Sequence, residues 1–226
     1  MKLYERLGAD DLCPSPIGYR VRIALALKGM DCVRVPMRFA DVERLEAETG
    51  SRTCPAMLDG DARLTDSAAI VRHLDLVQAK RPVLRDEDRH FKLSIVEQEL
   101  GTRAGKVIAP WFIERLCPED RDYYRSTREQ RYGMSFAELV AHRSAAELDL
   151  AFTIARVASG LDRSPFFSGN EPGFADTVIY GYLLWIDLAD PGAMPELPPG
   201  MAAWYEARDL AWRRPCLTPF ADLASA

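Results

Sequence analysis

The chain has 226 residues, of which 48% are hydrophobic, and a formal net charge of −5. This composition supports a substantial core and excludes intrinsic disorder, and the interspersed acidic and basic residues argue against a nucleic-acid or membrane-surface partner. The longest apolar run, Val178 to Ile186, is too short to span a bilayer, and acidic residues stand where a signal peptide needs an apolar stretch. We therefore expect a soluble, cytoplasmic protein.

The first third of the chain alternates strand and helix patterns. Ser15-Pro16 supplies an N-cap and a first helical residue, Gly29 a stop, and Asp59-Gly60 a hairpin turn. The elements expected in chain order are a strand over 2–5, a helix over 16–28, a strand over 32–37, a helix over 40–48, strands over 56–58 and 62–65, and a helix over 67–77. The order β-α-β-α-β-β-α predicts an α/β domain over residues 1–77.

The remainder of the chain changes character. Residues 78–87, with Pro82 and several charges, are typical of a linker. Beyond them β-type patterning disappears, and helices are expected over 88–105, 118–131, 135–159, 175–187 and 201–213. The predicted fold class is thus an α/β domain followed by an all-helical domain over residues 88–226.

One helix start is a candidate anion site. Ser15 precedes an apolar helical pattern, and a helix N-terminus stabilises an anion through its unpaired N–H groups. The pair Asp66-Ser67 opens another helix. The five cysteines contain no Cys-x-x-Cys pair, and the three histidines lie far apart, so we expect a reduced chain without a metal site.

Four landmarks, in this order and at this spacing, resemble the glutathione S-transferase family over nearly the whole chain. They are Ser15-Pro16 with Arg20 five residues after Ser15, the run from Cys54-Pro55 to Leu58, the run from Asp66-Ser67 to Ile70, and the segment 167–176. The resemblance implies a thioredoxin-like first domain, glutathione as co-substrate, a small hydrophobic electrophile as second substrate, and a homodimer. Serine at position 15 is similar to the serine-type enzymes, and Pro110-Trp111-Phe112 resembles the bacterial β-aryl-etherase branch.

The resemblance also implies roles for individual residues. Ser15 would donate a hydrogen bond to the glutathione thiolate, and Cys54 would pair its main chain with the cysteinyl part, next to a cis Pro55. Asp66 and Ser67 would hold the γ-glutamyl group, and Asp176 would cap the helix that follows it.

Two positions depart from the family pattern. Gly173 stands where a capping Ser or Thr is usual, which removes half of a capping box. Thr53 replaces a basic residue that often contacts a cofactor carboxylate, and Arg52 is the candidate to compensate for it.

A helix N-terminus and a hydrogen bond from Ser15 together supply enough stabilisation to lower a thiol pKa by about 2 units without a general base. Most of the acceleration must then come from holding the electrophile against the sulfur. The helical domain is expected to carry that apolar pocket. Its candidate wall residues are Leu7, Ile17, Trp111 and Phe112.

Other interpretations stay open. Ser15 and Asp66 are also ordinary helix caps, and the fold occurs in binding or regulatory proteins without turnover. A glutathione-dependent thiol-disulfide reductase working through Cys13 or Cys54 is the alternative from another reaction class. Arg121, Arg125 and Arg128 lie on one helical face and suit an acidic substrate, but neighbouring acids favour a solvated, ion-paired face.

Overall fold

The computed structural model describes residues 1–85 and 87–220, with side chains described outside 87–96. The first half is a small mixed sheet with three helices, which confirms the predicted element order. Its elements are β1 (Lys2–Arg6), α1 (Pro16–Lys28), β2 (Val33–Met37), α2 (Val42–Thr49), β3 (Ala56–Asp59), β4 (Ala62–Thr65) and α3 (Ser67–Val77).

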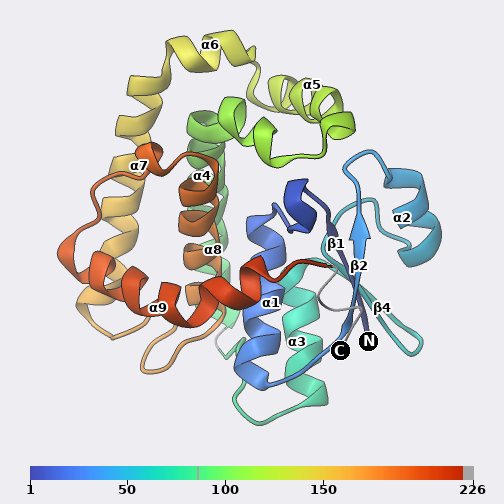
Figure 1. Cartoon of the computed structure of the whole chain (residues 1–226). Coiled ribbons are helices and arrows are strands. Elements are labelled where there is room, and N and C mark those ends of the chain that lie inside the picture. Colours follow the sequence, from blue (N-terminus) through green and yellow to red (C-terminus); the bar gives the residue numbers. More distant parts are fainter. Residues whose placement is uncertain (86, 221–226) are drawn as a thin grey trace.

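The sheet has the strand order β2-β1-β3-β4. β1 runs parallel to β2, with Lys2 opposite Val33, and antiparallel to β3, with Tyr4 opposite Ala56. Helices α1 and α3 lie on the side of the sheet that faces the rest of the chain, and α2 covers the other side (Figure 1). This is the thioredoxin-like arrangement expected from the sequence.

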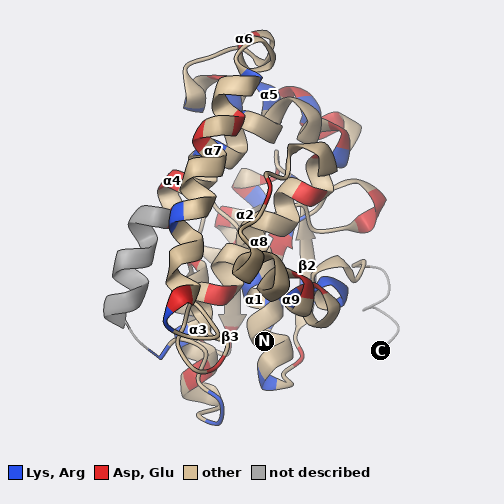
Figure 2. Cartoon of the chain, turned by 90° about the vertical axis from the view of Figure 1, so that its left-hand side faces the viewer, with Lys and Arg blue, Asp and Glu red and all other residues tan. Residues whose placement is uncertain are grey.

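The second half is helical, as predicted. Its elements are α4 (Glu87–Phe112), α5 (Arg121–Tyr132), α6 (Phe136–Ala141), α7 (Arg143–Ala158), α8 (Phe174–Ala189) and α9 (Pro199–Leu217), with short 3-10 turns between several of them. Helix α8 packs against both α1 and α4, and α9 lies across α1 and α8 (Figure 1). Figure 2 shows acidic and basic residues interspersed over the face formed by α4 and α7.

The two largest differences from the predicted helix boundaries concern α4 and the helix expected over 135–159. α4 continues through Pro110 to Phe112, because a proline near a helix end loses only one backbone hydrogen bond. The single helix expected over 135–159 is divided at His142, whose φ of −100° and ψ of 12° are not helical. Ser135 caps α6, and a separate helix α7 starts at Arg143.

Most of the core joins the two halves. Helix α1 is buried on nearly all sides, because it lies between the sheet and α8. At Gly181 of α8, a Cβ atom would lie 2.8 Å from the carbonyl oxygen of Pro16, so the two backbones touch where α1 begins. A small second core, around Tyr4, Met37 and Leu45, lies under α2.

Arginines of α1 also connect the two halves through an ion pair and a hydrogen bond. Both oxygens of the fully buried Glu5 carboxylate are used, accepting from Nε of Arg22 and Nε of Arg34 at 2.8 Å each. Arg22 in turn donates to the carbonyl oxygen of Cys216 at 2.6 Å, which ties the end of α9 to α1 and the sheet. Arg20 of α1 pairs with Glu97 of α4 at 2.6 Å. These contacts hold α1 in one position relative to the helical half.

The segment 78–87 is anchored where it is described. The Asp75 carboxylate accepts from the backbone N–H of Val83 and of Leu84, and from Nζ of the buried Lys28 at 2.7 Å. Within the described ranges, no helix is long and apolar enough to cross a membrane.

Candidate active site

The start of α1 presents the Ser15 hydroxyl. Ser15 has extended backbone angles, and its Oγ accepts a hydrogen bond from the Gly18 N–H at 3.3 Å, as an N-cap does. Because the oxygen is the acceptor in that bond, its own proton remains available for donation to a ligand. Pro16 is the first helical residue, a position whose N–H would have no partner within the helix, so the proline costs no hydrogen bond. Ser15 is half-buried at the edge of a cavity.

That cavity, of about 380 Å³, lies between the two halves. Ser15, Ile17 and Cys54 line it from the thioredoxin-like half, and Phe112 lines it from α4. The structure thus brings four of the sequence-predicted site residues together around one cavity.

The opposite wall is aromatic and was largely missed by sequence reasoning. It contains Phe112, Tyr124 of α5, Tyr182 and Trp185 of α8, and Tyr132 at the end of α5. The Phe112 ring lies 5.5 Å from the Trp185 ring and 5.7 Å from the Tyr124 ring, centroid to centroid. No sequence motif marks these residues, because they come from three helices whose rotation depends on packing.

Two glycines one turn apart make room for this wall. A Cβ at Gly101 of α4 would lie 2.6 Å from the Tyr182 hydroxyl oxygen, and one at Gly105 would lie 2.0 Å from the Tyr132 hydroxyl oxygen. Glycine costs about 1 kcal/mol relative to alanine in a helix. Here it lets two phenols lie against the α4 backbone. Burial raises the pKa of Tyr132 and of Tyr182, so both phenols are neutral hydrogen-bond donors.

The Cys54–Pro55 peptide bond is cis, as the family resemblance implies. It lies just before β3, whose ladder with β1 and β4 begins at Ala56. The main chain of Cys54 therefore sits outside the sheet, beside the cavity.

Asp66 and Ser67 lie at the start of α3, outside the lining of this cavity. The exposed Asp66 carboxylate caps α3, accepting from the N–H of Ala68 at 2.7 Å and of Ala69 at 3.3 Å, with a left-handed φ of 79°. Ser67 is buried, and its Oγ lies 3.5 Å from Nη1 of Arg20. Arg20 retains a buried Nε and Nη2 without a hydrogen-bond partner among the described residues. Sequence reasoning noted Arg20 but gave it no role.

Leu7 and Trp111 do not line the cavity. Leu7 is half-buried against the core, and its N–H donates to the carbonyl oxygen of Met37. The Trp111 ring lies under the guanidinium of Arg143, 4.2 Å from its carbon atom, on the α7 side of α4. Adjacent residues of a helix point about 100° apart, so Phe112 faces the cavity and Trp111 does not.

The buried Cys13 and the partly buried Cys54 are poor nucleophiles. Burial, the largest effect, raises the pKa of Cys13 and of Cys54 to about 12 each. All five cysteines are free thiols. Among the described residues, no three His, Cys, Asp or Glu side chains gather as a metal site would require.

Asp176 has the structural role predicted for it. Its fully buried carboxylate accepts from the N–H groups of Gly173, Phe167 and Ser168 and from the Trp204 indole. A Cβ at position 173 would lie 2.7 Å from Ser168, so glycine is required there by space.

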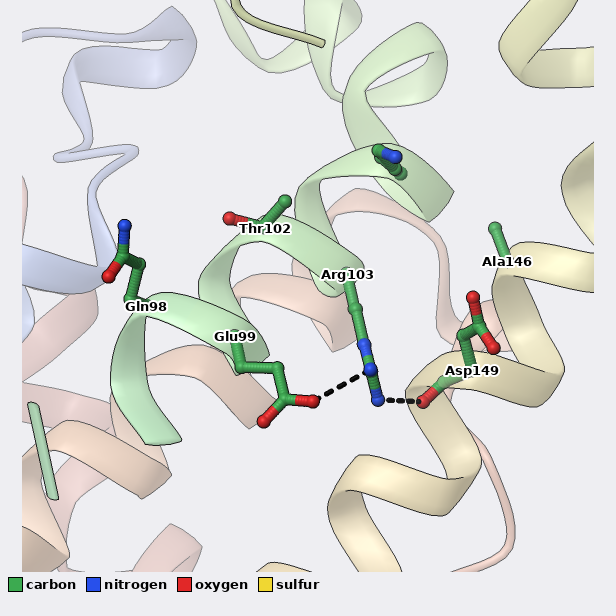
Figure 3. A pocket seen from close by; sticks show the side chains of 7 residues that line it. Gln98, Glu99, Thr102, Arg103, Ala146 and Asp149 are labelled. Carbon is green, nitrogen blue, oxygen red and sulfur yellow. Dashed lines mark hydrogen bonds and ion pairs between the residues drawn. The ribbon is translucent and has the colours of Figure 1, made fainter. Parts of the chain in front are cut away.

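A second depression, of about 410 Å³, lies between α4 and α7. Figure 3 shows Glu99 and Arg103 of α4 facing Asp149 of α7. The Arg103 guanidinium pairs with Glu99 at 2.7 Å and donates to the Asp149 carbonyl oxygen at 3.1 Å. Arg103 and Glu99 are thus paired with each other, and no cysteine, histidine or serine is among the described residues that line this depression.

A thioredoxin-like domain whose helix α1 opens on a shared cavity, followed by a helical domain, defines the class of this protein. Family models agree: residues 11–82 match the glutathione S-transferase N-terminal domain, and residues 90–193 match its C-terminal domain. The chain belongs to the glutathione S-transferase family.

Individual relatives are more distant. Glutathione S-transferase Z1 of Arabidopsis thaliana is 36% identical over 127 residues, which are 52% of this chain and 57% of that protein. A probable glutathione S-transferase GSTU6 of Oryza sativa subsp. japonica is 27% identical over 85% of this chain and 79% of its own. The chain thus spans little more than half of the first of these curated relatives.

Solved structures show the same fold. Glutathione transferase GSTFuA3 from Phanerochaete chrysosporium superposes with a TM-score of 0.78 at 20% identity, covering 93% of this chain and 96% of its own. Glutathione S-transferase CsGST63524 of Ceriporiopsis subvermispora, in complex with glutathione, gives 0.80 at 19% identity, covering 96% and 98%.

Proposed function

We propose that this protein is a glutathione transferase of the serine type. The observation that carries the proposal is the position of the Ser15 hydroxyl, which caps α1 and borders the aromatic cavity with its proton free to donate. Glutathione would lie along the thioredoxin-like half, with its cysteinyl part beside the main chain of Cys54 and Pro55. Its γ-glutamyl group would lie at the start of α3, near Asp66 and Ser67.

The reaction needs no base from the protein. The glutathione thiol releases its proton to water, and Ser15 keeps its own proton while donating a hydrogen bond to the sulfur anion. The thiolate then forms a carbon–sulfur bond with an electrophile in the cavity. In a displacement, the bond to the halide or aryloxide breaks, and the leaving group departs with the electron pair. In a conjugate addition, the resulting carbanion takes a proton from water.

The reductase alternative is disfavoured by the cysteines. A redox thiol works through its thiolate, and a pKa of about 12 leaves Cys13 and Cys54 protonated at neutral pH. A binding protein without turnover shares the fold and is distinguished by activity alone.

We further propose a homodimer in the reducing cytoplasm. The five free cysteines suit a reducing compartment. Phe152 and Leu148 of α7 expose 72% and 62% of their surface, which suits an apolar contact between two copies. Phe152→Lys is expected to convert a dimer into a monomer in analytical ultracentrifugation. The control Leu210→Lys, at a 91% exposed position on α9, is expected to change nothing; a wild-type monomer would refute the dimer.

The test of the transferase is a paired measurement. Thermal stabilisation by millimolar glutathione reports binding, and turnover of chlorodinitrobenzene and of a β-aryl ether reports transfer. Stabilisation with turnover of either compound supports the proposal and separates conjugation from ether cleavage. Stabilisation without turnover on a broad panel of electrophiles favours a binding protein, and absence of stabilisation removes glutathione from the function.

A further inference from the structure

The cavity beside Ser15 is positively charged. Four arginines line it, Arg6, Arg52, Arg128 and Arg131, and none of the described lining residues is Asp or Glu. The whole chain has the opposite balance, with a net charge of −5. A cavity of this sign in an acidic protein attracts anions.

Two of these arginines have no carboxylate partner among the residues whose side chains the structure describes. Arg128 of α5 approaches Thr127 Oγ1 at 3.4 Å, and its guanidinium lies 4.7 Å from the centre of the Tyr124 ring. Arg131, one turn later on the same face, is exposed, and no ion pair joins it to any described residue. By contrast, Arg121 at the start of the same helix pairs with Glu114 at 2.9 Å. The sequence-based preference for an ion-paired face therefore holds for Arg121 and not for Arg128.

The other two arginines, Arg6 and Arg52, line the cavity from the thioredoxin-like half, across from the aromatic wall. Arg52 pairs with Glu46, and Arg6 donates to the carbonyl oxygen of Arg38 at 2.6 Å. Both come from the thioredoxin-like half, along which glutathione would lie. Arg128 and Arg131 come from α5, which Figure 1 shows above that half. Arg128 and Arg131 therefore line the helical side of the cavity, where the second substrate would bind.

Two buried donors in the same wall also lack partners. The Tyr124 hydroxyl and the Trp185 indole N–H are buried without a hydrogen-bond partner among the described residues, and both side chains line the cavity. Tyr124 and Trp185 are only 1% and 8% exposed. Burial, the largest effect, raises the pKa of the Tyr124 phenol, so it is a neutral donor. An unpaired buried donor is costly, and a ligand oxygen at this wall relieves that cost.

We propose that the second substrate is an aromatic electrophile that carries a carboxylate. The ring would lie among Phe112, Tyr124 and Trp185, and the carboxylate would face Arg128 and Arg131, whose guanidinium groups suit it. This inference rests on the proposed transferase function and names the substrate class of that site. In the test reaction, the glutathione thiolate forms a bond to the ring carbon, and chloride leaves with the electron pair of the carbon–chlorine bond.

The test compares two electrophiles of nearly equal shape, 4-chloro-3,5-dinitrobenzoate and 4-chloro-3,5-dinitrobenzamide. Each kcat/KM is divided by the rate of the uncatalysed reaction with glutathione, which removes the difference in intrinsic reactivity. We expect the enzyme to favour the carboxylate by about tenfold, equivalent to about 1.4 kcal/mol. The preference should fall as salt is added, because the arginines are partly exposed.

Variants assign the preference to α5. In Arg128→Gln/Arg131→Gln the ratio of carboxylate to amide is expected to fall to about one, while the affinity for glutathione stays unchanged. Arg125→Gln is the matched control: Arg125 is on the same helix, its guanidinium lies over Phe136, and it does not line the cavity. The exposed single variant Arg131→Gln replaces the double variant if the latter does not fold.

Binding of the two purified glutathione conjugates, measured by calorimetry, gives a readout that does not depend on turnover. Equal affinity for the carboxylate and amide conjugates refutes the inference, whether or not the protein is a transferase. Preference for the carboxylate conjugate without turnover of either compound supports a carboxylate-binding wall at Arg128 and Arg131 and counts against the transferase function, and with it against a second substrate. Weaker binding of glutathione itself in the double variant assigns the arginines to the cofactor and also refutes the inference.

Discussion

Replacing Ser15 with alanine separates two roles of one hydroxyl. The first role is the cap on α1, where Oγ accepts from the Gly18 N–H at 3.3 Å. Loss of such a cap costs about 1 kcal/mol of stability. The second role is the proposed hydrogen bond to the glutathione thiolate, and a hydrogen bond to a charged group contributes about 1.5–3 kcal/mol. At 1.36 kcal/mol per unit, its loss raises the pKa of the bound thiol by about 1–2 units.

The effect on rate depends on pH. With a bound-thiol pKa of about 6.5 in the wild type, Ser15→Ala at pH 6 loses about 8- to 80-fold in thiolate. The more basic sulfur is about 3- to 10-fold more nucleophilic, so the net single-turnover rate falls about 3- to 10-fold. At pH 9.5 both enzymes carry mostly thiolate, and Ser15→Ala is then expected to be several-fold faster. The two pH profiles should cross.

The assay is an ultraviolet titration of the bound thiolate together with single-turnover rates from pH 5.5 to 9.5. Ser135→Ala is the matched control, because Ser135 caps α6 through the Glu138 N–H at the same 3.3 Å and does not line the cavity. It should lose stability and leave the bound-thiol pKa unchanged. A pKa in Ser15→Ala within about 0.3 units of the wild type would show that the serine does not stabilise the thiolate.

Three further predictions concern packing and burial. Gly101→Ala is expected to cost about 1–3 kcal/mol in urea unfolding and to raise KM for the electrophile, because its Cβ would lie 2.6 Å from the Tyr182 hydroxyl oxygen. Glu5→Gln leaves two buried guanidinium groups without their shared carboxylate and is expected to cost about 3–5 kcal/mol. Cys54 is expected to resist alkylation until strongly alkaline pH in mass spectrometry, because burial raises its pKa to about 12. Since this pKa is above the unfolded value, near 9.0, its contribution to stability is complete below pH 9 and is lost as the pH rises toward 12.

Each of these three predictions has a control variant or an outcome that would contradict it. Lys106→Ala, on the same helix as Gly101 but in the α4–α7 depression, should leave KM unchanged. Glu48→Gln, which breaks the exposed pair with Arg44, should cost under about 1 kcal/mol, and a similar small cost for Glu5→Gln would contradict the buried-charge argument. Rapid alkylation of Cys54 at pH 8 would show that its thiol is not shielded.

The position of the Ser15 hydroxyl at the start of α1 was predictable from sequence because its signals are local. An N-cap serine followed by proline, a glycine stop and a turn of Asp59-Gly60 each act within a few residues, so they specify the same structure in any surroundings. The spacing of Ser15, Cys54 and Asp66 then identified the family. The structure shows the cis Cys54–Pro55 bond and the capped helix at the expected residues.

The aromatic wall of the cavity was decided only by the tertiary structure. Trp111 and Phe112 were equivalent in the sequence, but the rotation of α4 turns one toward Arg143 and the other into the cavity. Likewise, the arginines of α5 share one periodic pattern, and only the packing of α5 against α4 and the adjoining turns determines that Arg128 lies over Tyr124 at the cavity wall. A helical pattern specifies which residues share a face, whereas the partner of that face depends on contacts between residues far apart in the chain.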